Sequence, residues 1–167
     1  MKNATVVVVG GGGREHALCL SLDASPLVDS IHCVPGNAGT ARLATNHACD
    51  MSVESLLDVF RRVEADLVVV GPEAPLCEGL ADACSDVHIP CFGPVAALAH
   101  LEGSKLHAKQ TMELAGVPTA EYQRLDHHSD VNAALDAFSG APWVVKRDVL
   151  AGCLLYTSPS PRDRYIS

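Results

Sequence analysis

The chain has 167 residues and a mass of 17.5 kDa, enough for one compact domain or for one domain and part of a second. Hydrophobic residues make up 48% and charged residues 19%, a balance that excludes intrinsic disorder. Twelve Lys and Arg against twenty Asp and Glu give a net charge of −8, which argues against nonspecific binding to nucleic acid or to anionic membranes. Any bound phosphate must therefore be held locally, by main-chain amides and a few cations.

The N-terminal sequence passes from Lys2 into a run of valines without the layout of a signal peptide, and no apolar run approaches the about 18 residues of a membrane span. We therefore expect a cytoplasmic protein. The seven cysteines form no CxxC pair, which favours neither a disulfide framework nor a zinc site. We interpret them as small buried hydrophobic residues.

The first part of the chain predicts a strand, a glycine loop and a helix. Residues 5–9 are a β-branched run, typical of a strand buried on both faces of a parallel sheet, and four glycines follow at 10–13. Apolar residues then recur at helical spacing over 14–22. A second strand is predicted at 30–34, closed by the turn-forming residues 35–39.

The same alternation continues to residue 94. The predicted elements are a helix from the N-cap Ser52 to residue 63, a strand at 67–70, a break at 71–75, a helix over about 76–84 and a strand at 88–92. This alternation is typical of an α/β doubly wound parallel sheet, which binds ligands at the carboxyl ends of its strands. The loops after the first, second and third predicted strands all open at that edge.

The pattern changes near residue 102, where a second structural unit begins. We predict a helix at 104–115 with Gly116 at its C-terminal end, a second helix at 129–138 and a short strand at 143–146. Residues 153–167 show neither helical nor strand periodicity. We interpret them as a disordered tail or as sequence foreign to the natural product, such as read-through.

The glycine loop does not fit a dinucleotide site. In a GxGxxG register that starts at Gly10 or Gly11, the last position is Glu15 or His16, and no acid ends the second predicted strand. No Gly-Lys-Ser or Gly-Lys-Thr occurs, which excludes a Walker A loop. Anion binding by the helix N-terminus, aided by the guanidinium of Arg14, is the interpretation that remains; a tight turn without a ligand is the alternative.

The next two loops carry polar groups suited to a phosphosugar. Asn37, Gly39 and Thr40 offer an amide, a hydroxyl and main-chain N–H groups to a sugar or its phosphate. Glu73 lies between two prolines, where a fixed carboxylate suits an amine or ribose hydroxyls. An ordinary surface acid in a rigid turn is the alternative for this glutamate.

Two lysines of the second unit indicate a polyphosphate. Lys105 starts a predicted helix, where the helix dipole disfavours a lysine unless an anion neutralises it. Lys146 ends the predicted strand at 143–146. Two lysines so placed predict a clamp on phosphates, although either one alone is also compatible with a solvated surface lysine.

Five segments, in order and spacing, resemble the phosphoribosylamine–glycine ligase (glycinamide ribonucleotide synthetase) family of the ATP-grasp superfamily. They are VVGGGGREHAL (8–18), PGNAGTA (35–41), VVGPEAPL (69–76), CFGP (91–94) and LEGSK (101–105). The resemblance implies a substrate-binding α/β domain at 1–101 and the start of an ATP-grasp region at 102–152, with 153–167 unmatched.

The resemblance also implies an activity and a site. Family members use ATP, with Mg²⁺, to phosphorylate glycine, and the amine of 5-phosphoribosylamine then displaces the phosphate to give glycinamide ribonucleotide for purine synthesis. By similarity, the residues that line the phosphoribosylamine site are Gly12, Gly13, Arg14, Glu15, Asn37, Gly39, Thr40, Pro72 and Glu73. Lys105 and Lys146 match the two lysines that contact the ATP phosphates.

The sequence departs from the family after the predicted strand at 143–146. The glycine-rich stretch that follows in family members is kept only in part, over residues 147–152. About two thirds of the expected enzyme, including its Mg²⁺ ligands, has no counterpart, so no metal ligand is assigned and we expect no ligation by this chain alone. A stand-alone phosphosugar-binding module is the alternative function, and a nucleotide-dependent oxidoreductase is a third.

Overall fold

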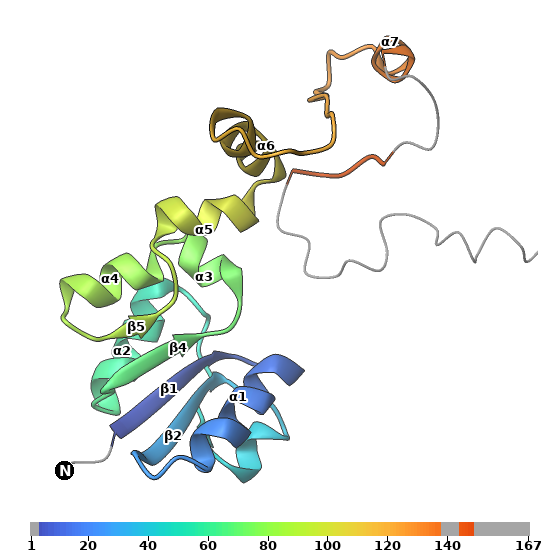
Figure 1. Ribbon diagram of the computed structural model, residues 1–167. Coiled ribbons are helices and arrows are strands. Elements are labelled where there is room, and N and C mark those ends of the chain that lie inside the picture. Colours follow the sequence, from blue (N-terminus) through green and yellow to red (C-terminus); the bar gives the residue numbers. More distant parts are fainter. Residues whose placement is uncertain (1–3, 138–143, 149–167) are drawn as a thin grey trace, which may run out of the picture. The chain divides into compact units, whose positions relative to one another are not determined.

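The computed structural model describes residues 4–137 and 144–148 and divides the chain into two units, 1–100 and 101–167. The N-terminal unit is built on a five-stranded sheet with the order β3-β2-β1-β4-β5, in which every neighbouring pair is parallel (Figure 1). The strands are β1 (Ala4–Gly10), β2 (Val28–Pro35), β3 (Thr45–Asn46), β4 (Leu67–Val70) and β5 (Cys91–Phe92). The predicted α/β parallel sheet is confirmed.

Helices cover both faces of this sheet. They are α1 (Gly13–Asp23), a 3-10 turn η1 (Thr40–Arg42), α2 (Val53–Arg62), α3 (Glu73–Cys77), α4 (Leu80–Asp86) and α5 (Ala96–Gly103). On one face, Val7 and Val9 of β1 share a core with Phe60 of α2 and with α4. On the other face, Val8 packs with Cys19 of α1. Because β1 is buried on both faces, it has the continuous valine run of a central parallel strand.

Three predicted elements of the N-terminal unit differ from the structure. The break expected at 71–75 is the start of α3, because Pro75 lies in the first turn of the helix, where a missing N–H leaves no bond unmade. The single helix predicted at 76–84 is two, α3 and α4, separated by Gly79 at φ +91°. The strand predicted at 88–92 is only two residues long, since His88 has φ +58° and Pro90 precedes β5.

Three of the six cysteines among the described residues are buried, as predicted, and the other three are half-buried; all six are free thiols. Cys19 Sγ lies 3.2 Å from Cys33 Sγ inside the sheet–α1 core. Burial raises the pKa of both thiols, that of Cys33 to about 12. They are therefore protonated, unreactive core residues at neutral pH. Cys153 lies outside the described residues.

The described part of the C-terminal unit contains two helices. Helix α6 (Lys105–Leu114) lies within the predicted 104–115; Ser104 is its N-cap residue, and Gly116 follows it with φ +65°. Helix α7 (Val131–Asp136) is shorter than the predicted 129–138, because the carboxylate of Asp130 accepts hydrogen bonds from the next turn and so fixes the helix start.

The strand predicted at 143–146 is not present over its described residues. Val144 and Val145 are 73% and 71% exposed and have no strand partner among the described residues of this unit. Residue 143 and the predicted tail at 153–167 lie outside the described part of the chain. Within the described residues, none of the helices combines the length and the apolar character needed to cross a bilayer.

Candidate functional site

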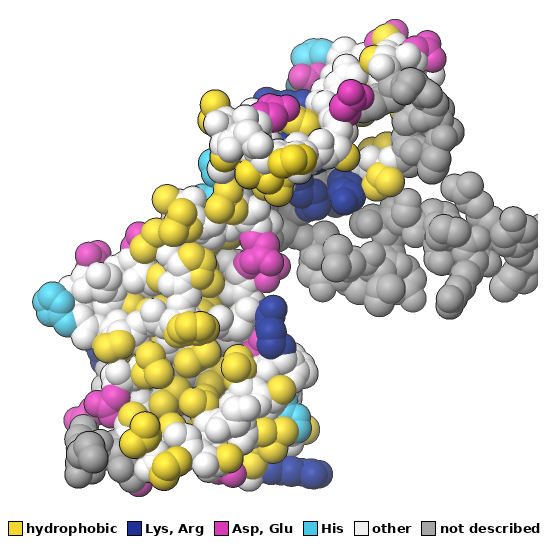
Figure 2. Space-filling view, in the orientation of Figure 1, with side chains coloured by type: hydrophobic (Ala, Val, Ile, Leu, Met, Phe, Trp, Pro, Cys, Tyr) yellow, Lys and Arg dark blue, Asp and Glu magenta, His cyan; other side chains and the backbone are white. Residues whose placement is uncertain are grey.

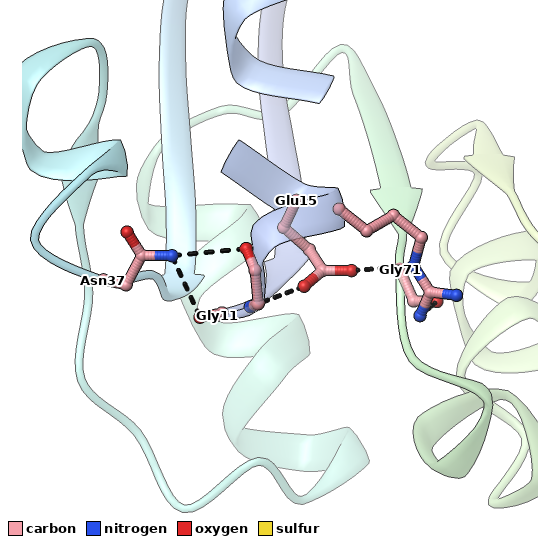
Figure 3. Close-up of polar contacts among 6 residues, drawn as sticks. Gly11, Glu15, Asn37 and Gly71 are labelled. Carbon is pink, nitrogen blue, oxygen red and sulfur yellow. Dashed lines mark hydrogen bonds and ion pairs between the residues drawn. The ribbon is translucent and has the colours of Figure 1, made fainter. Parts of the chain in front are cut away.

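Three loops of the N-terminal unit emerge side by side at the carboxyl edge of the sheet. Val9 of β1 pairs with Val34 of β2 and with Val70 of β4, so the three strands end at the same level. The loops that follow are therefore neighbours, as the sequence predicted. Figure 3 shows the polar contacts that join them.

A buried carboxylate organises the first loop. Glu15 is only 4% exposed, and its Oε2 accepts a hydrogen bond of 2.6 Å from the main-chain N–H of Gly12. This bond is the half of a capping box in which the N3 side chain accepts from the N-cap N–H, since Gly12 has no side chain to return the bond. A Cβ atom on Gly10 would lie 2.7 Å from Glu15 Cγ, and one on Gly71 would collide with the same carboxylate. The position of this carboxylate therefore explains why Gly10 in the first loop and Gly71 in the third have no side chain.

Three of the four consecutive glycines are required by packing within the protein, and Gly13 is the exception. A Cβ on Gly11 would lie 2.7 Å from Gly36 O, whereas one on Gly13 would have no neighbour within 4 Å. Gly13 is exposed and is the first residue of α1. The first N–H groups of a helix have no partner within it, so open space in front of them suits an anion.

Arg14 connects the first loop to the third. Its Nη2 donates to the carbonyl oxygen of Gly71, and its Nε donates to Glu15 Oε1 at 3.1 Å. The side chain is 65% exposed, so N–H groups that these two bonds do not use face solvent. A guanidinium fixed in this way offers a preorganised cation at the shared edge.

The side chain of Asn37 connects the second loop to the first. Its Nδ2 donates to the carbonyl oxygens of Gly11 and Gly12 at 2.9 and 3.2 Å. Its Oδ1 accepts from the N–H groups of Gly39 and Thr40 at 2.7 and 3.0 Å. The amide predicted to face a sugar is thus engaged in four hydrogen bonds within the protein.

The side chains of Thr40 and Asn46 fix the second loop through hydrogen bonds. Thr40 is fully buried, and its Oγ1 accepts from the N–H of Asn37 at 2.8 Å and lies 2.9 Å from Asn46 Oδ1. Asn46 Nδ2 donates to Asn37 O at 2.8 Å. Sequence reasoning missed Asn46, because a two-residue strand has no periodicity that would reveal it. Both side chains support the loop from inside the protein.

The third loop presents Pro72 and Glu73. Pro72 is the N-cap residue of α3 and Glu73 is its first residue, and both are half-buried. The ring of Pro72 lies beside the first loop, since a Cβ on Gly10 would be 3.0 Å from Pro72 Cδ. Glu73 is therefore the first residue of a helix at the shared edge, whereas the sequence predicted a rigid turn there.

Lys105 and Lys146, predicted to contact ATP, both lie in the C-terminal unit. Lys105 begins α6, and Lys146 is exposed in the segment 144–148. The carboxylate of Asp148 accepts hydrogen bonds of 3.1 Å from Ser104 Oγ and from the N–H of Leu106, so this segment is joined to the start of α6. The N–H of Leu106 lowers the pKa of Asp148, and Lys105 adds to that effect.

The carboxylate of Asp148 thus offsets the positive charge of Lys105 at the start of α6. Asp148 was not among the residues predicted from the sequence. Among residues 4–137 and 144–148, no group of three or more His, Cys, Asp or Glu side chains is arranged to hold a metal ion.

Comparisons with known proteins decide the family. Residues 4–102 match the family model described as phosphoribosylglycinamide synthetase, N domain. The chain belongs to this family. It is 52% identical over 147 residues to phosphoribosylamine–glycine ligase from Streptomyces coelicolor and 44% identical over 149 residues to the ligase from Escherichia coli O157:H7.

The chain spans about a third of the length of these relatives: the aligned residues are 87% of this chain but 35% and 34% of the two ligases. Among solved structures, phosphoribosylamine–glycine ligase from Thermotoga maritima superposes with a TM-score of 0.54 at 33% identity, over 70% of this chain and 26% of that chain. N5-carboxyaminoimidazole ribonucleotide synthetase from Thermus thermophilus, at 21% identity and a TM-score of 0.61, shares the fold over 79% of this chain and 36% of its own.

Proposed function

We propose that the N-terminal unit is the 5-phosphoribosylamine-binding domain of a cytoplasmic phosphoribosylamine–glycine ligase, and that residues 102–152 begin its ATP-grasp region. The observation that carries this proposal is the set of hydrogen bonds that joins the three loops at one edge. Family membership supports the substrate class.

The residues of the proposed site divide into two groups. Gly13 and Arg14 receive the phosphate through the N-terminus of α1 and the exposed side of the guanidinium, which together provide main-chain N–H groups and a positive charge. Gly12 lies beside them, with its own N–H bonded to Glu15. Glu73 accepts hydrogen bonds from the ribosyl hydroxyls or the amine. The remaining residues hold this geometry: Pro72 at the start of α3, Glu15 beneath the first loop, and Asn37, Gly39 and Thr40 within the second.

In the proposed reaction, ATP phosphorylates the glycine carboxylate, and the amine of phosphoribosylamine attacks the acyl carbon and expels inorganic phosphate. Lys105 and Lys146 contact the ATP phosphates, and Mg²⁺ neutralises their charge when it is bound. Because the chain spans about a third of the relatives' length, we propose that it does not complete this reaction alone. ATP-dependent formation of glycinamide ribonucleotide by the purified 167-residue chain would refute that statement.

Titration with ribose 5-phosphate, followed by isothermal calorimetry or by amide chemical shifts, tests the proposed site. We expect shifts in the glycine loop and at Glu73, and an affinity at least about tenfold weaker in Arg14→Ala, which loses a charge-assisted contact. Arg61→Ala removes the same charge in the last turn of α2, outside the three loops, and is the matched control. Equal affinity of the Arg14→Ala and Arg61→Ala variants would contradict the site.

A stand-alone phosphosugar-binding module is the second candidate, favoured by a hydrophobic core that lies within the N-terminal unit. ATP distinguishes the two candidates. A module binds ribose 5-phosphate tightly and shows no response to ATP, whereas a ligase fragment binds both ligands weakly and shows amide shifts around Lys105 on addition of ATP.

A further inference from the structure

A cavity outside the proposed substrate site lies along the outer edge of the sheet. It has a volume of about 240 Å³ and lies beside the first half of β2, the end of that strand opposite the three loops. The residues that line it are Asp23, Val28, Asp29, Ser30, Ile31, Leu43, Ala44 and Thr45. Pockets for drug-sized ligands begin at about 300 Å³, so this cavity suits one long side chain better than a whole metabolite.

The cavity exists because β3 is short. Only Thr45 and Asn46 pair with β2, opposite His32 and Cys33. The two preceding residues turn back, since the N–H groups of Leu43 and Ala44 donate to Thr40 O at 2.9 and 2.8 Å. Residues 28–31 of β2 therefore have no strand partner on this side within the described chain, and the cavity occupies the place of a longer β3.

The lining of the cavity is mainly polar, with a smaller apolar part. Asp23 and Asp29 are exposed, and Val28, Ile31 and Leu43 contribute the apolar part. Neither carboxylate has an ion-pair partner among the described residues. A side chain that ends in a cation complements this lining, because its charge reaches the two carboxylates while its methylene groups contact the apolar part.

We propose that the outer edge of β2 binds an extended segment of a partner protein, which adds to the sheet as a strand and places a lysine or arginine side chain between Asp23 and Asp29. An unpaired edge presents main-chain donors and acceptors to an incoming strand, which supplies affinity, while the acidic cavity selects the side chain. An acidic or purely apolar segment leaves both carboxylates unpaired and binds more weakly.

Fluorescence anisotropy with labelled peptides tests this proposal on the full chain. The probe is a peptide of alternating threonine and lysine, and the control peptide carries glutamate in place of lysine. We expect saturable binding of the lysine peptide only, weakened at least about tenfold by the double variant Asp23→Asn/Asp29→Asn. The matched double variant Glu54→Gln/Asp86→Asn removes two charges elsewhere in the same unit and keeps the affinity.

A third peptide separates strand addition from charge attraction alone. N-methylation on alternate residues removes main-chain donors but keeps every lysine, and we expect it to abolish binding. Equal binding of the methylated peptide, or of the lysine peptide to both double variants, would overturn the proposal. The site uses none of the residues proposed to bind ribose 5-phosphate, so failure of that titration leaves this experiment unaffected.

Discussion

The two units of the chain differ in how much hydrophobic surface they bury. In the N-terminal unit, residues from both sheet faces form clusters around Phe60, Cys19 and Leu76. In the described part of the C-terminal unit, Ala134 is the one buried hydrophobic residue, and Leu114 at the end of α6 is 91% exposed. The first unit is therefore stabilised by its own core, whereas local caps hold the helices of the second.

Exposed hydrophobic residues also occur on the first unit, near its last strand. Figure 2 shows hydrophobic side chains gathered over β4, β5 and α5, and the exposed members include Phe92 (72%), Val95 (41%) and Leu98 (58%). An exposed patch of this kind is typical of a surface that other protein covers. The two units therefore differ in the size of their buried cores, whereas both have exposed apolar side chains.

The largest expected effect is on the core of the first unit. Phe60 is fully buried between α2 and the sheet, so Phe60→Ala should lower the free energy of unfolding by about 3–5 kcal/mol. Leu114→Ala should change it by less than about 0.5 kcal/mol, because the side chain is exposed. Urea unfolding followed by circular dichroism measures both. Similar losses in the two variants would contradict the difference between the units.

A smaller effect is expected where the first and third loops meet. Gly71→Ala should cost about 1–3 kcal/mol, because the new methyl group collides with the carboxylate of Glu15. Gly13→Ala should change stability by no more than about 0.5 kcal/mol, since its Cβ has no neighbour within 4 Å. The thermal midpoints of the two variants check the prediction. A destabilised Gly13→Ala protein would mean that the space before α1 is filled.

Acid should weaken the first unit through a pair of histidines. His32 Nδ1 lies 2.8 Å from His47 Nε2, and Arg62 Nη2 lies 3.5 Å from the other ring nitrogen of His47. Burial lowers the pKa of both histidines, and for His47 the charges of His32 and Arg62 add to the effect. The unfolded state therefore binds protons more readily, and stability present at pH 7.5 is lost as the pH falls below about 6.5.

Urea midpoints at pH 7.5 and 5.5 test this linkage. The midpoint should be lower at pH 5.5, and the decrease should be smaller in His32→Gln, which keeps a polar side chain but cannot gain a proton. His100→Gln, at an exposed position, is the matched control and should keep the full decrease. A decrease of the same size in all three proteins would assign the pH dependence to other groups.

The smallest effect compares two equivalent serine caps. Ser52 Oγ accepts from the N–H of Ser55 at 3.3 Å in the first unit, and Ser104 Oγ accepts from the N–H of His107 at 3.0 Å in the second. Ser52→Ala should lower global stability by about 1 kcal/mol, because α2 packs in the core. Ser104→Ala should increase amide hydrogen exchange in α6 only. A shifted global midpoint in Ser104→Ala would show that α6 folds together with the first unit.

Sequence reasoning predicted the elements that have strong local signals. The valine run of β1 and the Ser52 cap of α2 both reveal their structure within a few residues. Strands β3 and β5 were missed or overextended, because pairing with a neighbouring strand determines a two-residue strand. The strand expected at 143–146 was wrong over its described residues, since Val144 and Val145 are exposed and have no strand partner in the described part of the chain.

The candidate site was predictable in its position but not in its internal bonding. Glycine loops after parallel strands indicate the carboxyl edge, and the topology brings Arg14, Asn37 and Glu73 to that edge. The sequence does not reveal that Glu15 is buried or that Asn37 uses its amide within the protein. Both facts depend on contacts between loops that are distant along the chain.

The position of β1 also affects how the chain folds on the ribosome. It comes before the other four strands of the sheet along the chain, yet it lies in the middle of the sheet, and Val6 pairs with Leu67, 61 positions further on. Its second edge therefore stays open until β4 has left the exit tunnel. Such non-local pairing slows folding and leaves an unpaired valine strand exposed to aggregation until β4 is available.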